Sequence, residues 1–235
     1  MANAWEDPRV ASGMHKQLRW RRELIEQGKK PLGWKLAFGG PRAMERLKTN
    51  APLVGFLMAD AVVPSGSTIS LAGWTKPAAE PEVAVYMGKD LGRNADRPTV
   101  MEAIAGLGAA IEVADVDHPS EDVEGTLARD LYQRHLILGE CDAACTGGKL
   151  SGLRAQVVRN GAAMADTTDL EALTGELIAI VGHVANLLSF FGESLRAGEL
   201  IIAGSITPPI WVEVGEKLCF RLEPRPPLYV SFSAA

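Results

Sequence analysis

The segment that most constrains this chain is a strand-like run with two glutamates, from Lys76 to Leu91. Glu80 and Glu82 begin an alternation that continues into Val83 and Val85. Residues two apart on a β-strand point to the same face, so the two carboxylates are expected to lie side by side. Like charges at that distance repel, and burying both without a partner is costly. The pattern therefore predicts a bound cation; the alternative is that both glutamates are solvated at a strand entrance, or that one is protonated.

A third glutamate lies at the centre of another strand-like run. Glu112 is flanked by Ile111 and Val113 and shares its face with small alanines. It is a candidate third ligand, and a salt bridge to an arginine is the competing interpretation. A set of carboxylates alone favours a hard cation, Mg²⁺ or Mn²⁺, over Zn²⁺, which usually recruits His or Cys.

A lysine interrupts a short apolar strand near the N-terminus. Lys35 lies between Trp34 and Leu36, in a segment that we expect to be buried. Residue-type statistics favour a lysine that points to solvent. A lysine that pointed inward would need a counter-charge, and a carboxylate cluster would supply one.

Composition excludes several classes of protein. The chain has 235 residues, 47% of them hydrophobic and 23% charged, with a net charge of −5. These values are typical of a globular protein and argue against a nucleic-acid partner. We find no signal peptide and no apolar run long enough to span a membrane, so we expect a cytoplasmic protein with no membrane partner. The three cysteines, Cys141, Cys145 and Cys219, are expected to be free thiols.

Further patterns predict the remaining elements. Helices are expected from about residue 11 to 27, from Thr99 to Gly106 or Gly108, and from Val184, with His183 at its start. Turn signals predict a hairpin around Asn160-Gly161 and another at Gly215-Glu216, which would join strands 210–214 and 217–223. No repeat or long linker interrupts the chain. We therefore expect a single domain, residues 1–235, that is mostly β structure with a few packed helices, including an N-terminal helical segment, residues 1–30.

Small and hydroxyl-bearing residues follow the strand predicted at 199–203. Gly204, Ser205 and Thr207 are followed by two prolines. Such residues let a ligand come close to the backbone, although a simple turn has the same composition.

Six motifs occur in an order that resembles one family. They are Gly33-Trp34-Lys35-Leu36, Asp60 before the turn Val63-Pro64-Ser65-Gly66, Glu80-Pro81-Glu82-Val83 leading to Met87-Gly88-Lys89-Asp90-Leu91, Ile111-Glu112-Val113 with Asp115, Gly182-His183, and Leu195-Arg196-Ala197-Gly198 running to Gly204-Ser205. This order resembles the 2-keto-4-pentenoate hydratase and 4-oxalocrotonate decarboxylase branch of the fumarylacetoacetate hydrolase superfamily. The resemblance extends from about residue 30 to the C-terminus.

The resemblance implies an α+β fold, a mixed β-roll or sandwich with a few peripheral helices, and a homo-oligomer. It also implies a Mg²⁺ or Mn²⁺ ion held by Glu80, Glu82 and Glu112, and a small 2-oxo or 2-hydroxydienoic acid as substrate. Lys35 would be both catalytic and substrate-binding. Asp60 would assist proton transfer, and Gly204, Ser205 and Thr207 would line the far side of the substrate.

The implied activity is a metal-dependent hydratase that adds water to a 2-hydroxy-2,4-dienoate in the catabolism of aromatic compounds. The alternatives are a 2-oxo-acid decarboxylase, a hydrolase of C–C bonds, or a non-catalytic partner subunit. A hydrolase would need a histidine to activate water, and only His118 and His135 are near the relevant strands. One segment departs from the family: the hydratases carry Asp-Asn-Ala-Ser where this chain has residues 129–133, Arg-Asp-Leu-Tyr-Gln.

Overall fold

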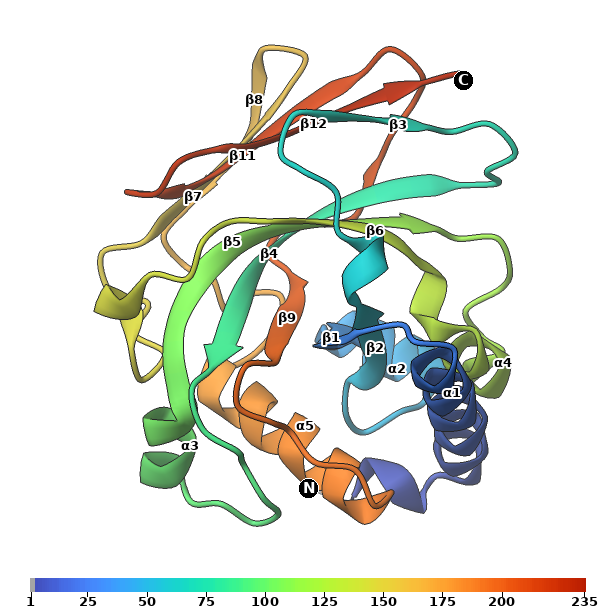
Figure 1. Cartoon of the computed structure of the whole chain (residues 1–235). Helices are drawn as coiled ribbons and strands as arrows, with labels where there is room; N and C mark the ends of the chain where they lie inside the picture. Colours follow the sequence, from blue (N-terminus) through green and yellow to red (C-terminus); the bar gives the residue numbers. More distant parts are fainter. Residues whose placement is uncertain (1–2) are drawn as a thin grey trace.

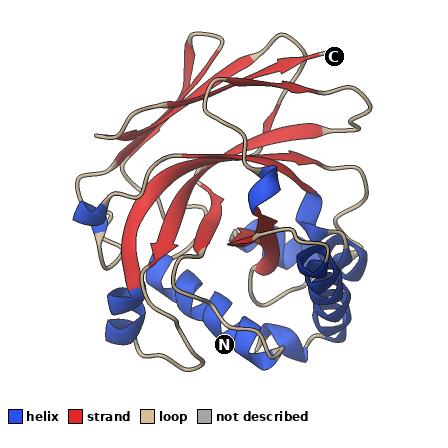
Figure 2. Ribbon diagram, viewed as in Figure 1, coloured by secondary structure: helices blue, strands red, loops and turns tan. Residues whose placement is uncertain are grey.

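The computed structural model describes residues 3–235 and contains two β-sheets, one of them strongly curled, with helices along one side (Figures 1 and 2). The curled sheet has the strand order β2-β1-β9-β4-β5-β6, and β10 adds to β4. Its strands are β1 (Pro31–Ala37), β2 (Leu53–Met58), β4 (Pro77–Met87), β5 (Ile104–Asp115), β6 (Gln133–Leu138), β9 (Leu200–Ser205) and β10 (Ile210–Trp211). The expected α+β fold, a mixed β-roll with peripheral helices, is confirmed.

The second sheet packs on the outer face of the first, at the top of Figure 1. Its order is β3-β12-β11-β7-β8. These strands are β3 (Ser67–Ser70), β7 (Arg154–Arg159), β8 (Ala162–Thr167), β11 (Lys217–Glu223) and β12 (Leu228–Ser233). Val83 of β4 and Val113 of β5 belong to the same buried apolar core as Phe220 and Val230 of this second sheet. The outer face of β4 and β5 is therefore buried against the second sheet, and only the inner face is available for a site.

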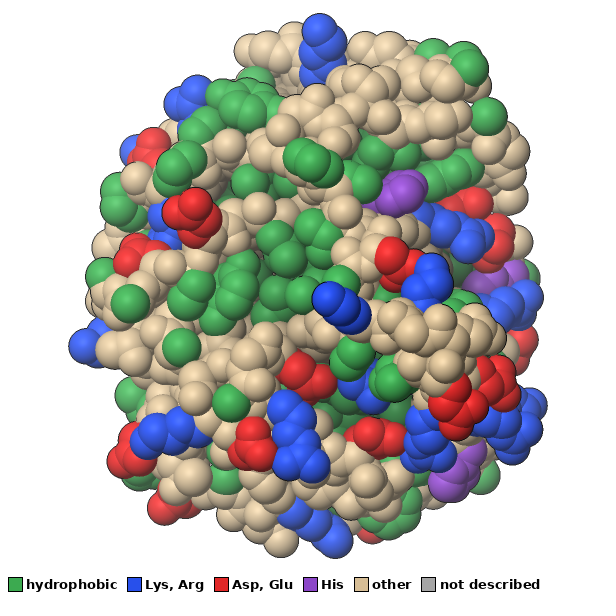
Figure 3. Space-filling view, viewed as in Figure 1, with side chains coloured by type: hydrophobic (Ala, Val, Ile, Leu, Met, Phe, Trp, Pro, Cys, Tyr) green, Lys and Arg blue, Asp and Glu red, His purple; other side chains and the backbone are tan. Residues whose placement is uncertain are grey.

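Five α-helices and four short 3₁₀ turns complete the described chain. The α-helices are α1 (Pro8–Glu26), α2 (Pro41–Leu47), α3 (Arg97–Ala103), α4 (Val123–Ala128) and α5 (Leu177–Phe190). The 3₁₀ turns are η1 (Ala4–Glu6), η2 (Ala59–Ala61), η3 (Asp130–Tyr132) and η4 (Ala143–Cys145). Within residues 3–235, no helix is both long enough and apolar enough to cross a membrane. Acidic and basic side chains interleave on the face shown in Figure 3.

The inner face of the curled sheet carries a small apolar cluster of its own. It consists of Leu57, Ala84, Ala110, Leu136, Leu200 and Ile202. Ala110 lies directly opposite Glu82 in the pairing of β5 with β4. Small alanines leave room inside the curl, so larger polar side chains from the same strands fit beside them.

Several predicted elements are confirmed, among them the N-terminal helix, which is α1, and the hairpin at Asn160-Gly161, which joins β7 to β8. The hairpin predicted at Gly215-Glu216 is wrong, because β10 pairs with β4 whereas β11 pairs with β7 and β12. Turn residues alone do not reveal that the chain crosses from one sheet to the other at this point. The three cysteines are free thiols, as expected.

Two helix boundaries also differ from expectation. The helix predicted from Thr99 ends at Ala103, and its cap is Asp96, whose side chain accepts a hydrogen bond from the Thr99 amide at 3.0 Å. Residues 104–108 extend β5 instead, because their side chains are buried between the sheet and its neighbours. His183 lies in the middle of α5, which begins at Leu177 after its cap Glu176.

Gly33 provides a test of how closely β1 and β9 pack. A Cβ atom at Gly33 would lie 1.9 Å from the carbonyl oxygen of Leu200, which belongs to the backbone of β9. Gly33→Ala is expected to lower the free energy of unfolding by about 2 kcal/mol or more, because strand β1 must move. Gly92→Ala is the control, since Gly92 has nothing within 4 Å of such an atom. Urea unfolding would measure both variants, and equal midpoints would contradict this packing.

Candidate metal centre

Three glutamates converge on the inner face of the curled sheet. Glu80 on β4 lies directly opposite Glu112 on β5, and Glu82 follows two residues later on the same face of β4. Each residue offers a carboxylate oxygen, and the three oxygens lie within 4.8 Å of one another. The two-residue spacing and the antiparallel register together bring the carboxylates to one point.

The carboxylates are buried and incompletely satisfied. Glu82 and Glu112 are both 0% exposed, and Glu80 is partly buried. Oε1 of Glu82 and Oε2 of Glu112 have no hydrogen-bond partner among the described residues. Unpaired buried carboxylate oxygens carry a large desolvation cost, which a coordinated cation would remove. Three oxygen donors suit Mg²⁺ or Mn²⁺, so the residues present fit such an ion.

Lys35 points into this cluster. Its side chain is buried, and its ammonium group donates to Oε1 of Glu112 and, at 3.0 Å, to the carbonyl oxygen of Leu131. The structure thus decides the alternatives left open for Lys35, which does not face solvent. The ion-pair partner of Glu112 is this lysine and not an arginine.

Burial and mutual repulsion shift the pKa values of the cluster. Burial, with the charge of Glu112 as the second cause, raises the pKa of Glu80 to about 7. Burial likewise raises the pKa of Glu82 well above its usual value, and that of Glu112 despite the nearby Lys35. Burial alone would lower the pKa of Lys35, but the carboxylates led by Glu112 outweigh it and the net shift is upward. The lysine therefore remains charged, and a metal ion that binds the carboxylates competes with protons for them.

The end of β9 completes the site on the other side of β4. Gly204 has a φ of +93°, which suits glycine, and its amide donates to Oε2 of Glu82 at 2.7 Å. Ser205 lies opposite Glu82, and its hydroxyl makes only a long contact of 3.5 Å with the carbonyl of Pro81. The hydroxyl of Thr207 donates to the carbonyl of Pro208 at 3.0 Å.

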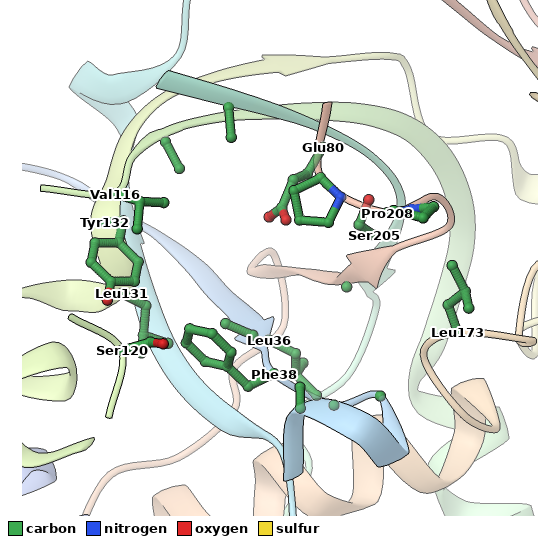
Figure 4. A pocket seen from close by; sticks show the side chains of 18 of the residues that line it. Leu36, Phe38, Glu80, Val116, Ser120, Leu131, Tyr132, Leu173, Ser205 and Pro208 are labelled. Carbon is green, nitrogen blue, oxygen red and sulfur yellow. The ribbon is translucent and has the colours of Figure 1, made fainter. Parts of the chain in front are cut away.

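A cavity of about 1120 Å³ opens beside the carboxylates (Figure 4). Lys35, Glu80, Gly204, Ser205 and Thr207 all line it. Figure 4 shows the carboxylate of Glu80 pointing into the space, with Leu36 and Phe38 on the opposite side. Glu82 and Glu112 do not line the cavity, but each has a carboxylate oxygen within 4.8 Å of one from Glu80, so all of the expected site residues except one lie at this cavity or directly beside it.

The exception is Asp60. It lies in η2, is exposed, and forms an ion pair with Lys29 on the surface. It does not line the cavity, so the structure does not bring it together with the other expected site residues. A short sequence distance from the β2 strand does not fix the direction in which this turn points.

The two histidines considered for water activation differ in position. His118 lines the cavity, and its Nδ1 lies 2.5 Å from Oδ1 of Asp117. His135 stacks on Trp74 and does not line the cavity.

The turn η3 reaches the site, although none of its residues was among the expected site residues. Asp130, Leu131 and Tyr132 have φ values of 59°, 53° and 68°. The carbonyl oxygen of Leu131 accepts a hydrogen bond from the Lys35 ammonium group. Oδ1 of Asp130 accepts a hydrogen bond of 2.8 Å from the backbone amide of Phe56. A run of three non-glycine residues in the left-handed region has no signature in residue types. The departure of residues 129–133 from the family pattern is the one available signal.

This chain matches one protein family and is similar to individual enzymes. The family model described as fumarylacetoacetate (FAA) hydrolase C-terminal matches residues 34–226. A 2-hydroxyhexa-2,4-dienoate hydratase of Comamonas testosteroni is 25% identical over 91% of this chain and 83% of its own length. A 4-oxalocrotonate decarboxylase of Pseudomonas putida is 26% identical over 88% of this chain and 80% of its own.

One solved structure has a closely similar fold. It is the 4-oxalocrotonate decarboxylase of Pseudomonas putida G7 complexed with magnesium and adipate, with a TM-score of 0.85 and 24% identity. The match covers 95% of this chain and 86% of that protein.

The raised pKa of Glu80 makes metal binding depend on pH. A carboxylate whose pKa is about 7 is mostly protonated below that pH, and a cation must displace the proton. Titration calorimetry is expected to show Mg²⁺ affinity rising with pH through 7, by about tenfold per unit where one proton is released. In Glu80→Gln, binding should be weaker and this pH dependence reduced. An affinity that stays constant between about pH 6 and pH 8 would contradict the arrangement.

Proposed function

Because this chain belongs to the fumarylacetoacetate hydrolase family, we propose that it is a divalent-metal-dependent hydratase of 2-hydroxy-2,4-dienoic acids. The observation that carries the proposal is the meeting of three carboxylates and one lysine beside a single cavity, which Glu80 and Lys35 line. The similar hydratase acts on an acid of this class, 2-hydroxyhexa-2,4-dienoate, as its name states. The catabolism of aromatic compounds is the setting that the names of the similar enzymes imply.

We assign the metal site to Glu80, Glu82 and Glu112. Support comes from the unpaired oxygens of Glu82 and Glu112 and from the oxygen-only donor set, which suits Mg²⁺ or Mn²⁺. The decarboxylase of similar fold is complexed with magnesium. When bound, such an ion supplies a Lewis acid that stabilises negative charge developing on the 2-oxo group of the substrate.

Lys35 is assigned as the proton-transfer and substrate-binding residue. An ammonium group has three N–H donors, and two of them already serve Glu112 and Leu131. The third remains for the substrate, whose carboxylate or dienol oxygen it would hold. Its fixed position lets it move a proton during conversion of the dienol to the keto form.

Gly204, Ser205 and Thr207 form the substrate-binding edge beside Glu80. The hydroxyl of Ser205 makes only a long internal contact, which leaves it for the substrate. In the overall reaction, one hydrogen and one hydroxyl from water add across the alkene and give a 4-hydroxy-2-oxo acid. The cavity supplies room for that water next to the bound acid.

Two alternative reactions have specific support. Decarboxylation of a 2-oxo acid is favoured by similarity to 4-oxalocrotonate decarboxylases and would use the same carboxylates. Hydrolysis of a C–C bond is favoured by His118, which lines the cavity beside Asp117. A non-catalytic partner subunit is less well supported, since Lys35 and the three glutamates are all in place.

We also propose that residues 1–235 form one catalytic domain, with α1 of the N-terminal segment, residues 1–30, packed on it. Helix α1 contributes Met14 and Leu18 to the main apolar core, which supports this division. We propose a homo-oligomeric state on the family resemblance, and we keep the cytoplasmic location expected from the sequence. Light scattering of the purified chain would test the first.

Product analysis tests the reaction type. The Mg²⁺-loaded protein is expected to remove the ultraviolet absorbance of 2-hydroxypenta-2,4-dienoate, because hydration breaks the conjugation. Mass spectrometry should show a product heavier by one water. Loss of carbon dioxide or cleavage of the carbon chain would favour the alternatives, and no Mg²⁺-dependent change with any dienoic or 2-oxo acid would contradict the proposed activity.

Substitution of one ligand tests the metal site. Glu82→Gln is expected to abolish Mg²⁺ binding in calorimetry and to reduce turnover by at least about 100-fold, because a neutral amide is a much weaker ligand for a hard cation. Glu102→Gln is the matched control, since the side chain of Glu102 is 71% exposed on α3, at the opposite end of β5 from Glu112. If the two variants bound Mg²⁺ with equal affinity, the assignment of Glu82 as a metal ligand would be contradicted.

A further inference from the structure

The cavity has an apolar wall that faces Glu80. Leu36 and Phe38 form one part of this wall, and Leu131 and Tyr132 form the adjoining part (Figure 4). The rings of Phe38 and Tyr132 meet edge to face with centroids 6.4 Å apart. The ring of His118 continues the surface, 4.4 Å from that of Tyr132. We call this surface, made of Leu36, Phe38, Leu131 and Tyr132, the tail wall.

Unusual backbone conformations present the tail wall to the cavity. Seven non-glycine residues of the described chain have positive φ, and four of them are Phe38 and the η3 residues Asp130, Leu131 and Tyr132. Left-handed backbone is unfavourable for a residue other than glycine, Asn or Asp, and such strain gathers at functional sites. The two segments come from distant parts of the chain and are strained where they meet the same cavity.

The hydroxyl of Tyr132 does not make this wall polar. It donates to the carbonyl oxygen of His118 at 3.0 Å and lies 3.4 Å from the hydroxyl of Thr126. The phenolic group is therefore held by the protein itself. What Tyr132 offers a ligand is the face and edge of its ring.

Among the described residues that line the cavity, Lys35 is the one buried lysine or arginine, and it is already bonded to Glu112 and Leu131. His118 is paired with Asp117. The other cationic side chains, Arg42, Arg46 and Lys76, are exposed, and of these Arg42 makes no ion pair with a described residue. Arg46 reaches Glu121, and the ammonium of Lys76 lies 4.0 Å from the ring centroid of Trp211.

Apolar surface continues from the tail wall to the opening. Leu173 and Trp211 line the cavity and are each 43% exposed, so they add accessible apolar surface to it. The volume of about 1120 Å³ is slightly above the range of about 300–1,000 Å³ for sites that bind drug-sized ligands. An acid of five or six carbons would leave most of this apolar surface uncovered.

We propose that the tail wall selects substrates whose end remote from the carboxylate carries a large apolar group, an aryl or long alkyl chain, over substrates that end in a second carboxylate. Phe38, Leu131 and Tyr132 are then specificity-determining residues. This inference rests on the proposed function, because it takes the acid end of the substrate to lie at Glu80 and Lys35. Burial of the apolar tail against the wall, with water released from both, provides the selectivity.

Saturated 2-oxo acids, which cannot be hydrated, test the inference by binding alone. The Mg²⁺-loaded protein would be titrated by calorimetry with pyruvate, 2-oxo-6-phenylhexanoate and 2-oxoadipate. The aryl acid is expected to bind at least about tenfold more tightly than pyruvate, as burial of a phenyl group implies. The dicarboxylate should gain no such advantage.

Variants identify the surface responsible. Phe38→Asn keeps a residue type that tolerates positive φ, and Leu173→Gln changes a half-exposed side chain, so neither is expected to unfold the protein. Each should weaken binding of the aryl acid by at least about threefold and leave pyruvate unchanged. Tyr229→Asn is the control, since Tyr229 is an exposed aromatic residue on β12 outside the cavity.

The outcomes separate the two proposals. If pyruvate binds in a Mg²⁺-dependent way but the aryl acid binds no tighter, or 2-oxoadipate binds tighter than the aryl acid, the selectivity is disproved and the proposed function stands. If none of the three acids binds the Mg²⁺-loaded protein, both fail together. Equal losses in Phe38→Asn and Tyr229→Asn would also overturn the role of the wall.

Discussion

Burial of one lysine against three glutamates inside a curled sheet is the interaction on which this structure depends. Isolated charges are not tolerated in such a place, and Lys35 offsets only one of the carboxylates that surround it. The remaining negative charge must be protonated or must meet a cation. Burial of this negative charge raises the pKa values of Glu80, Glu82 and Glu112, and a bound metal ion would neutralise the charge.

The neighbouring structure makes room for these charges and orients them. A Cβ atom at Gly55 would lie 2.9 Å from Cγ of Lys35 and 2.8 Å from Oδ1 of Asp130, so glycine there leaves space for the lysine. Ala110 is the small residue opposite Glu82, and the amide of Gly204 holds one oxygen of that glutamate. The strained turn η3 supplies the carbonyl that holds Lys35. The same turn directs Leu131 and Tyr132 to the cavity, so charge placement and substrate selection share one element.

Local sequence patterns predicted the parts of the site that depend on strand periodicity. Glu80 and Glu82 share a face because side chains alternate on any strand, and Glu112 stood out as a charge inside an apolar run. The pairing of Glu80 with Glu112 depends on the register of two strands that are distant in sequence, and the family resemblance supplied what periodicity could not. The inward direction of Lys35, the left-handed turn at 130–132 and the crossing of the chain between β10 and β11 arise from tertiary packing. Asp60 shows the opposite case, a motif residue that the fold directs to the surface.

A crystal structure of the protein soaked with Mn²⁺, with anomalous diffraction recorded near the manganese edge, tests the central claim most directly. The account predicts one strong anomalous peak bonded to carboxylate oxygens of Glu80, Glu82 and Glu112, with the amine of Lys35 still beside Glu112. An empty cluster, or a manganese ion bound only elsewhere on the molecule, would contradict it.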